Sequence, residues 1–171
     1  MVEQDADVLV DMGWVEDHLE DASVRIVEVD EDTGCYARAH IPGAIGLDWR
    51  RDLQASATCE FLDGPRLGAL LGAHGIGNEH TIVLYGDRGN WFAATTYWYL
   101  RYYGHEHVKL LEDDREGWMA AGLPTTAELP AHLPRRYVPR PGDAGFGAAH
   151  DDGSHSGWGG FGDAMLDPAT F

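Results

Sequence analysis

Three short runs of apolar and β-branched residues constrain the fold of this chain more than any other feature. They cover residues 24–29, 81–85 and 108–111. The middle run is continuously apolar, as expected of a strand at the centre of a parallel sheet. Segments with helical spacing of apolar residues lie between the runs. This alternation predicts an α/β fold in which a parallel sheet is flanked by helices on both faces.

Capping residues and apolar spacing predict four helices. Asp11 is a suitable N-cap for a helix over residues 11–19, and Pro65 stands near the first position of a helix over residues 65–74. An aromatic-rich helix over residues 91–103 ends at Gly104, and a fourth helix spans residues 115–121. Two further short strands are expected at residues 8–10 and 45–49. Residues 30–39 are expected to form a loop.

The composition changes beyond Pro124. Prolines at 130, 134, 139 and 141 interrupt regular structure, and residues 142–162 are dominated by Gly, Asp, His and Ser. We therefore expect one domain over residues 1–126. Residues 127–171 are expected to be a Pro- and Gly-rich linker or a disordered tail.

The charge of the chain is strongly one-sided. Twelve basic and 29 acidic residues give a net charge of −17, and Lys109 is the only lysine. Such a field disfavours nucleic acids and anionic membranes as partners. It fits either simple solubility or, as we favour, adaptation to high salt, where repulsion between carboxylates is screened. With neither a signal peptide nor a membrane-spanning run in the sequence, a soluble cytoplasmic protein is expected.

Three stretches of the chain carry a resemblance to a known family. The first is residues 29–30 with Tyr36 and the motif His40-Ile41-Pro42-Gly43-Ala44; the second is residues 82–94; the third is residues 103–111 followed by Trp118 and Gly122-Leu123-Pro124. In this order they resemble the rhodanese family over roughly residues 8–126. The pattern Asn90-Trp91-Phe92-Ala93 with Tyr97-Trp98-Tyr99 resembles the N-terminal half of two-domain thiosulfate sulfurtransferases in particular. The resemblance implies a five-stranded parallel sheet.

The resemblance also implies the chemistry of sulfane-sulfur transfer from thiosulfate to cyanide or a thiol. In catalytic rhodanese domains the loop after the central strand begins with a cysteine, whose thiolate carries the sulfur. Here the matching position is Asp87, or Gly86 if the alignment shifts by one, and neither can carry a persulfide. The family's first halves have this substitution. We therefore expect no catalytic residue, and a degenerate active-site loop formed by Gly86, Asp87, Arg88, Gly89, Asn90, Trp91 and Phe92.

Two other features depart from the family pattern. Residues Glu112-Asp113-Asp114 replace an Asp-Gly-Gly turn, which we expect to be strained or reshaped. The chain also ends at Phe171, where the family's linker leads into a second domain. We expect that catalytic second domain to be missing, either lost or encoded separately.

The candidate site residues each admit two interpretations. Asp87 is either a built-in anion in the loop's amide cradle or, as we favour, an N-cap of the following helix. Arg88 and Arg50 are possible anion or inter-domain contacts, although a solvated role balancing the acidic surface is the simpler expectation for Arg88. Cys35 and Cys59 are interpreted as incidental thiols, since neither follows a strand and opens a helix.

Histidines and aromatics elsewhere suggest other sites that we do not favour. His105-Glu106-His107 and the pair His150 and His155 are expected to be solvated, and neither a metal nor a cofactor is expected. The aromatic run from Trp91 to Tyr103 has helical spacing and is expected to pack in the core and at a domain interface.

Two functions remain open. The leading one is a rhodanese domain of a thiosulfate sulfurtransferase that is inactive alone. Its expected partners are a second rhodanese domain or a second copy of the chain, with a thiosulfate-like anion as a further candidate. The alternative is a non-catalytic binding or regulatory module that uses the degenerate loop to hold an anion or a partner. A phosphatase of similar fold is excluded, because it needs a Cys-x5-Arg loop and Ala93 stands where the arginine would be.

Overall fold

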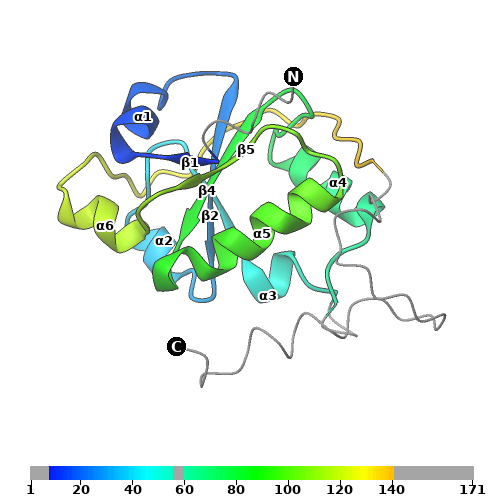
Figure 1. Cartoon of the computed structure of the whole chain (residues 1–171), viewed down its shortest axis with the longest axis horizontal. Coiled ribbons are helices and arrows are strands. Elements are labelled where there is room, and N and C mark those ends of the chain that lie inside the picture. Colours follow the sequence, from blue (N-terminus) through cyan, green and yellow to red (C-terminus); the bar gives the residue numbers. More distant parts are fainter. Residues whose placement is uncertain (1–7, 56–59, 141–171) are drawn as a thin grey trace.

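The computed structural model describes residues 8–55 and 60–140 and contains a five-stranded parallel sheet (Figure 1). The strands have the order β1-β5-β4-β2-β3. Neighbouring strands are parallel throughout. The predicted α/β fold with a five-stranded parallel sheet is confirmed. The strands are β1 (Leu9–Val10), β2 (Val24–Asp30), β3 (Ile45–Asp48), β4 (Thr81–Gly86) and β5 (Val108–Leu111).

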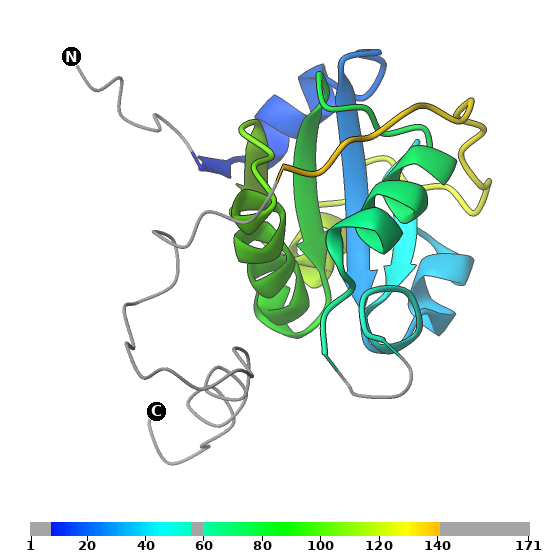
Figure 2. The ribbon, with the colours of Figure 1, turned by 90° about the vertical axis from the view of Figure 1, so that its right-hand side faces the viewer.

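Helices cover both faces of the sheet (Figure 2). On one face lie α4 (Gly64–Ala73) and α5 (Trp91–Tyr102), and on the other α1 (Met12–Asp17) and α6 (Arg115–Ala120). Strand side chains alternate between two hydrophobic clusters, since successive residues of a strand point to opposite faces. In β4, Ile82 and Leu84 pack towards α4 and α5, whereas Val83 and Tyr85 pack towards α1 and α6.

The predicted helices begin where capping aspartates precede them. Side chains of Asp11, Asp63 and Asp114 accept hydrogen bonds from Trp14 N, Arg66 N and Gly117 N, at 2.7, 2.9 and 3.0 Å. Such caps satisfy amides that have no partner within the helix. Within the described part of the chain, no helix is both long and apolar enough to span a membrane.

Two short helices differ from the sequence prediction. Residues 30–39 contain α2 (Gly34–Arg38) rather than a continuous loop, and β3 stops one residue early because α3 (Trp49–Asp52) begins at Trp49. Helices this short have no readable apolar period and depend on tertiary contacts, since helix nucleation is unfavourable. For α2 that contact is Tyr36, which is buried and donates a hydrogen bond to Ala44 O at 2.7 Å.

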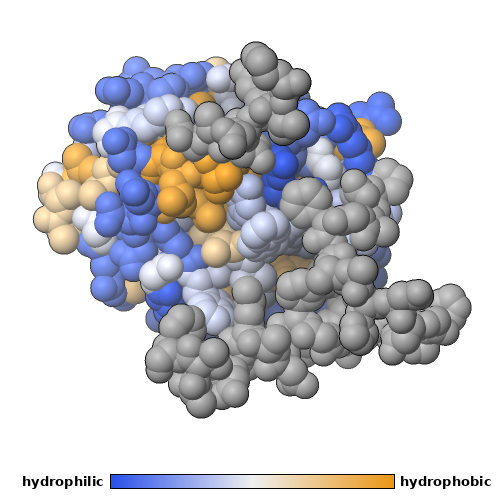
Figure 3. Space-filling model, viewed as in Figure 1, coloured by the Kyte–Doolittle hydropathy of each residue, from blue (hydrophilic) through white to orange (hydrophobic). Residues whose placement is uncertain are grey.

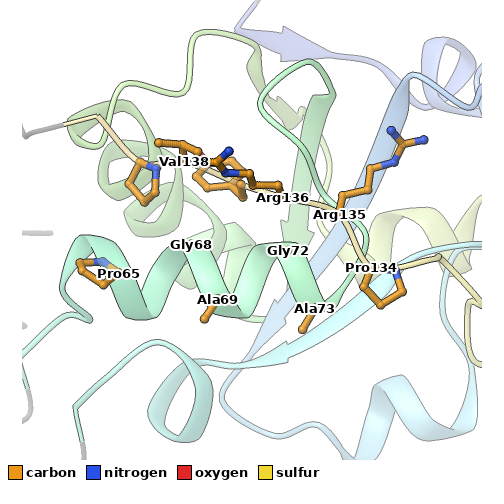
Figure 4. Close-up of a pocket in the computed structure, with 11 residues that line it drawn as sticks. Pro65, Gly68, Ala69, Gly72, Ala73, Pro134, Arg135, Arg136 and Val138 are labelled. Carbon is orange, nitrogen blue, oxygen red and sulfur yellow. The ribbon is translucent and has the colours of Figure 1, made fainter.

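Residues 130–140 form an extended segment, here called the strap, that lies along α4 (Figure 4). Backbone hydrogen bonds join Arg135 N to Gly72 O and Arg140 N to Tyr103 O, each at 2.9 Å. Tyr137 is buried between α4 and the sheet. The linker or tail predicted for residues 127–171 therefore has a packed beginning, and its remainder from residue 141 lies outside the described residues.

Glycines in α4 allow the strap to lie on the helix backbone (Figure 4). A Cβ atom at Gly72 would lie 2.5 Å from Arg135 O, and one at Gly68 would lie 3.0 Å from Tyr137 O. No side chain fits at the first distance without moving the strap. Glycine is therefore required in α4 by packing against the strap, which lies some 65 positions further along the chain.

Candidate functional site

The degenerate active-site loop, residues 86–92, begins at the carboxyl end of the central strand β4. Gly86 lies against the neighbouring strand β2, where a Cβ atom would be 2.1 Å from Val29 O. Only glycine fits there. The carboxyl edge of a parallel sheet is where ligand sites form in open α/β folds, so the loop has the expected position for a site.

The loop backbone is strained. Arg88, Gly89 and Asn90 all have positive φ, at 50, 63 and 62°. For residues other than glycine this conformation costs about 1 kcal/mol or more each. The buried Asn90 side chain holds the turn: Nδ2 donates to Leu111 O at 2.8 Å and to Asp113 O at 3.1 Å, and Oδ1 accepts from Gly86 N at 2.9 Å.

Side chains of this chain occupy the amides that would otherwise form an anion cradle. Asp87 N donates to Asp30 Oδ1 at 3.0 Å, and Gly89 N donates to Asp114 Oδ2 at 3.1 Å. Gly86 N is taken by Asn90. Free amides in such a loop can stabilise a bound anion. Here side-chain oxygens of Asn90, Asp30 and Asp114 accept those hydrogen bonds instead.

Asp87 does not have the capping role expected from the sequence. Its side chain makes no capping hydrogen bond, and α5 begins instead after Asn90 in the left-handed conformation. Its Oδ1 is buried and has no hydrogen-bond partner among the described residues. Burial, and next the nearby Asp30 carboxylate, raise the pKa of Asp87, and the backbone amides of Asp32 and Glu31 partly oppose the rise.

A buried charge network lies beneath the loop. Arg115 Nη2 donates to Glu28 Oε1 and to Asp30 Oδ2, the latter at 3.1 Å, and Tyr85 donates to Glu28 Oε2. All four residues are buried. Burial and the adjacent Glu28 carboxyl raise the pKa of Asp30 to about 8, although Arg115 acts in the opposite direction. Two carboxyl groups thus share one guanidinium, an arrangement that favours keeping a proton.

Comparison with known proteins agrees with this geometry. A family model described as "Rhodanese-like domain" matches residues 11–121. The chain belongs to the rhodanese-like family. Its solved relatives show the same fold: the 3-mercaptopyruvate sulfurtransferase SseA of Escherichia coli superposes with a TM-score of 0.67 at 20% identity, covering 79% of this chain and 55% of that one. The 3-mercaptopyruvate sulfurtransferase of Leishmania major gives 0.66 at 24%, covering 82% and 41%.

Relatives of higher sequence identity are longer than this chain. The chain is 42% identical to "Sulfur carrier protein TtuD" of Thermus thermophilus, covering 85% of this chain and 51% of the relative. It is 44% identical to a "Putative thiosulfate sulfurtransferase" of Haloferax volcanii, covering 77% and 48%. The chain therefore spans about half the length of these curated relatives.

The two arginines singled out in the rhodanese-like domain meet at one carboxylate. Arg50 Nη2 lies 2.5 Å from Glu31 Oε1, and Arg88 Nη2 lies 2.8 Å from Glu31 Oε2. Both guanidiniums are largely exposed at the rim of the loop. Arg51, by contrast, pairs with its neighbour Asp52. Glu31 was not expected from the sequence, because its role depends on three loops converging.

Cys35 lies near the start of a helix that follows a strand, contrary to the sequence analysis. It is the second residue of α2, which follows β2, because the segment taken for a loop contains a helix. Arg38 Nη2 lies 2.8 Å from its Sγ. Cys59 lies outside the described residues.

Two further segments from the sequence analysis can be placed. In the turn at residues 112–114, where strain or reshaping was expected, no residue has positive φ, and Asp114 both caps α6 and accepts from Gly89 N. His105 is buried, whereas a solvated side chain was expected. Its Nδ1 lies 2.9 Å from Tyr137 Oη and its Nε2 lies 2.9 Å from His80 O. His105 therefore anchors the strap; His107 is exposed as expected, and His150 and His155 lie outside the described residues.

Proposed function

We propose that this rhodanese-like domain is the non-catalytic, N-terminal half of a thiosulfate sulfurtransferase. The reaction moves the sulfane sulfur of thiosulfate to cyanide or a thiol, and a second rhodanese domain supplies the cysteine. One observation carries the proposal: an aspartate begins the loop where sulfur transfer needs a thiolate. The printed names of the longer relatives, which concern sulfur transfer and sulfur carriage, support it.

The electrostatics of the loop support inactivity of this chain alone. The carboxylates of Glu31 and Asp114 lie at the loop, where a dianion such as thiosulfate would bind. Their negative charge opposes anion binding, and the Asp30 carboxyl group already accepts the hydrogen bond of the Asp87 amide. Arg50 and Arg88 stand at the rim of this site, where they can contact the second rhodanese domain, a second copy of the chain, or an anion held between the two.

The alternative, a module that binds an anion in the degenerate loop, is less well supported. The amides of Gly86, Asp87 and Gly89 already donate to side chains of this chain. An anion entering the loop would have to displace Asp30 or Asp114. The net charge of −17 supports a halophilic source for the protein.

A thiosulfate-to-cyanide assay tests the proposal directly. The full chain should produce no thiocyanate above a buffer blank. Adding a catalytic rhodanese domain with its loop cysteine should give activity that depends on that added domain. Clear turnover by this chain alone, abolished by replacing Cys35 or Cys59, would contradict the proposal.

Replacement of Asp87 by cysteine tests the reason for inactivity. Asp87→Cys places a thiol in the loop, but the Asp30 carboxyl group still accepts from the amide of residue 87, and once ionised above its pKa of about 8 it opposes thiolate formation. We expect the double variant Asp87→Cys/Asp30→Asn to gain one sulfur atom in mass with thiosulfate more completely than Asp87→Cys. Equal loading of the two variants would show that Asp30 is not an obstacle.

A further inference from the structure

The two buried arginines of the described chain differ in their partners. Hydrophilic residues cover much of the face in Figure 3, and acidic residues outnumber basic ones by 29 to 12 in the chain. Arg115 accordingly pairs with the carboxyl groups of Glu28 and Asp30. Arg25 is as deeply buried, at 8% exposure against 7% for Arg115, but it forms no ion pair with any described residue. A buried charge without a counter-charge is costly, and an anion from outside the chain would supply one.

Backbone carbonyls satisfy only part of the Arg25 guanidinium. Nε donates to Gly75 O at 3.2 Å, and Nη1 donates to Ala22 O at 2.8 Å and to Val24 O at 2.9 Å. The Nη2 group, which also carries N–H donors, has no acceptor among the described residues. Burial lowers the pKa of Arg25, so the three carbonyls do not fully replace the lost hydration.

A cavity of about 200 Å³ is lined by Arg25 together with the rings of His18 and His132. Arg25 is the second residue of β2, so the cavity lies at the opposite edge of the sheet from the degenerate active-site loop. His18 Nδ1 lies 2.7 Å from Trp14 O, and His132 Nε2 lies 3.2 Å from Gly43 O. Since a carbonyl can only accept, each ring donates there and has its second nitrogen left as a donor when protonated. The cavity is smaller than sites for drug-sized ligands and suits a small ion.

Acidic side chains near the cavity do not neutralise Arg25. Glu20 and Asp21 line the cavity but are exposed, and Asp21 already accepts two hydrogen bonds within its own loop. Glu79, the carboxylate that acts electrostatically on Arg25, is 61% exposed and lies 3.1 Å from Arg135. Water and salt screen such exposed charges, whereas the guanidinium of Arg25 is shielded from both.

The free donors of Arg25 determine which kind of anion fits. A carboxylate is held best by two parallel N–H groups on different nitrogens of one guanidinium. At Arg25 both Nε and Nη1 are engaged, so no such pair is free. A tetrahedral oxyanion presents oxygens in several directions and can accept from Nη2 and from the two rings at once.

We propose that this cavity binds a small inorganic oxyanion of tetrahedral shape, such as sulfate or phosphate, through Arg25 Nη2 with His18 and His132 as further donors. The site is separate from the degenerate active-site loop, and the proposal does not depend on sulfur transfer. Its counterpart within the fold is Arg115, where carboxyl groups of the chain itself supply the negative charge.

The Nε–Hε resonances of arginine in the full chain, labelled with 13C and 15N, test this proposal. Triple-resonance spectra assign the signals of Arg25 and Arg115 without any substitution. Sodium sulfate, sodium phosphate and sodium acetate are titrated separately against sodium chloride at constant ionic strength and at about pH 6, where histidine side chains are partly protonated. Sulfate and phosphate should shift the Arg25 signal until it saturates, and the Arg115 signal should stay in place.

A shift of the Arg25 signal that grows without saturating, or that Arg115 shares, would overturn the proposal, since it would be a general effect of salt. A larger response to acetate than to sulfate would also overturn it and would assign the cavity to a carboxylate.

A substitution at the cavity wall gives a second, matched test. The exposed residue Ala22 lines the cavity, so a longer side chain there does not disturb the core. Ala22→Glu supplies a carboxylate beside Arg25 and should abolish the response to sulfate. Ala22→Gln has nearly the same shape without the charge and should keep a saturating response. Equal responses of the two variants would contradict the assignment of this cavity.

Discussion

The degenerate active-site loop and the strap both depend on contacts between distant parts of the chain. The contacts at the loop are polar and charged, whereas those at the strap are mainly steric. At the loop, side chains from the end of β2, from Asn90 in the loop itself and from the residue before α6 occupy backbone amides. At the strap, a backbone lies directly on glycines of α4, and the one deeply buried anchor, Tyr137, meets a neutral environment. The loop thus keeps the position of a site, at the carboxyl edge of the sheet. The strap contributes close backbone packing on α4.

Removal of a buried charge beneath the loop should lower the free energy of unfolding more than any change at the strap. Arg115→Met leaves Glu28 and Asp30 buried without their guanidinium. We expect a loss of about 3–5 kcal/mol in the free energy of unfolding, measured by urea denaturation. Adding Asp30→Asn to this variant should restore part of the loss, because one uncompensated carboxylate disappears. A loss below about 1 kcal/mol would mean that the network is well hydrated.

The next largest loss of stability should come from adding a methyl group where the strap packs on α4. Gly72→Ala places a methyl group where the Arg135 carbonyl lies, and we expect it to cost about 1–3 kcal/mol in urea denaturation. The matched control is Gly13→Ala in α1, where a Cβ atom would make only an ordinary contact at 3.4 Å with Asp11. There the better helix propensity of alanine should stabilise by up to about 1 kcal/mol. Equal effects at the two positions would argue against tight packing of the strap.

Protonation of His105 at acid pH should destabilise the packing of the strap. Burial lowers the pKa of this imidazole below its ordinary 6.5, so the unfolded state binds the proton more readily. Stability should therefore fall as pH drops below about 6.5 and continue to fall down to the folded pKa. Tyr137→Phe, which removes the hydroxyl that contacts His105, should cost about 1–2 kcal/mol at pH 8. Thermal denaturation across this range measures both effects, with His107→Gln as an exposed control.

The loop should respond to pH in the opposite direction. Asp30 has a pKa of about 8 in the folded protein against 3.8 ordinarily, so the folded state binds the extra proton. Stability should decline as pH rises from about 4 to 8, and Asp30→Asn should remove part of this slope. The change should stay below about 1.4 kcal/mol per pH unit, the value for one whole proton. A wild-type slope that Asp30→Asn leaves intact would place the proton elsewhere.

Features that depend on local sequence were predictable. The five strands alternate with helices because each apolar run and each capping aspartate acts within a few residues. The absence of a loop cysteine is visible in the sequence alone. A clue to the buried network was also present: Glu28 and Asp30 lie in a strand rich in valine and isoleucine, and buried carboxyl groups need partners. The partner, Arg115, is 85 residues away from Asp30 and has no local signal.

The sequence by itself determined the alternation of strands and helices and the presence of an aspartate at position 87, because these follow from short-range periodicity and from the identity of one residue. The tertiary structure decided how the loop is filled, how Glu31 joins Arg50 to Arg88, why His105 is buried and where the strap lies. Each of these depends on contacts between segments that are far apart along the chain. Their geometry is fixed only when the sheet has brought those segments together.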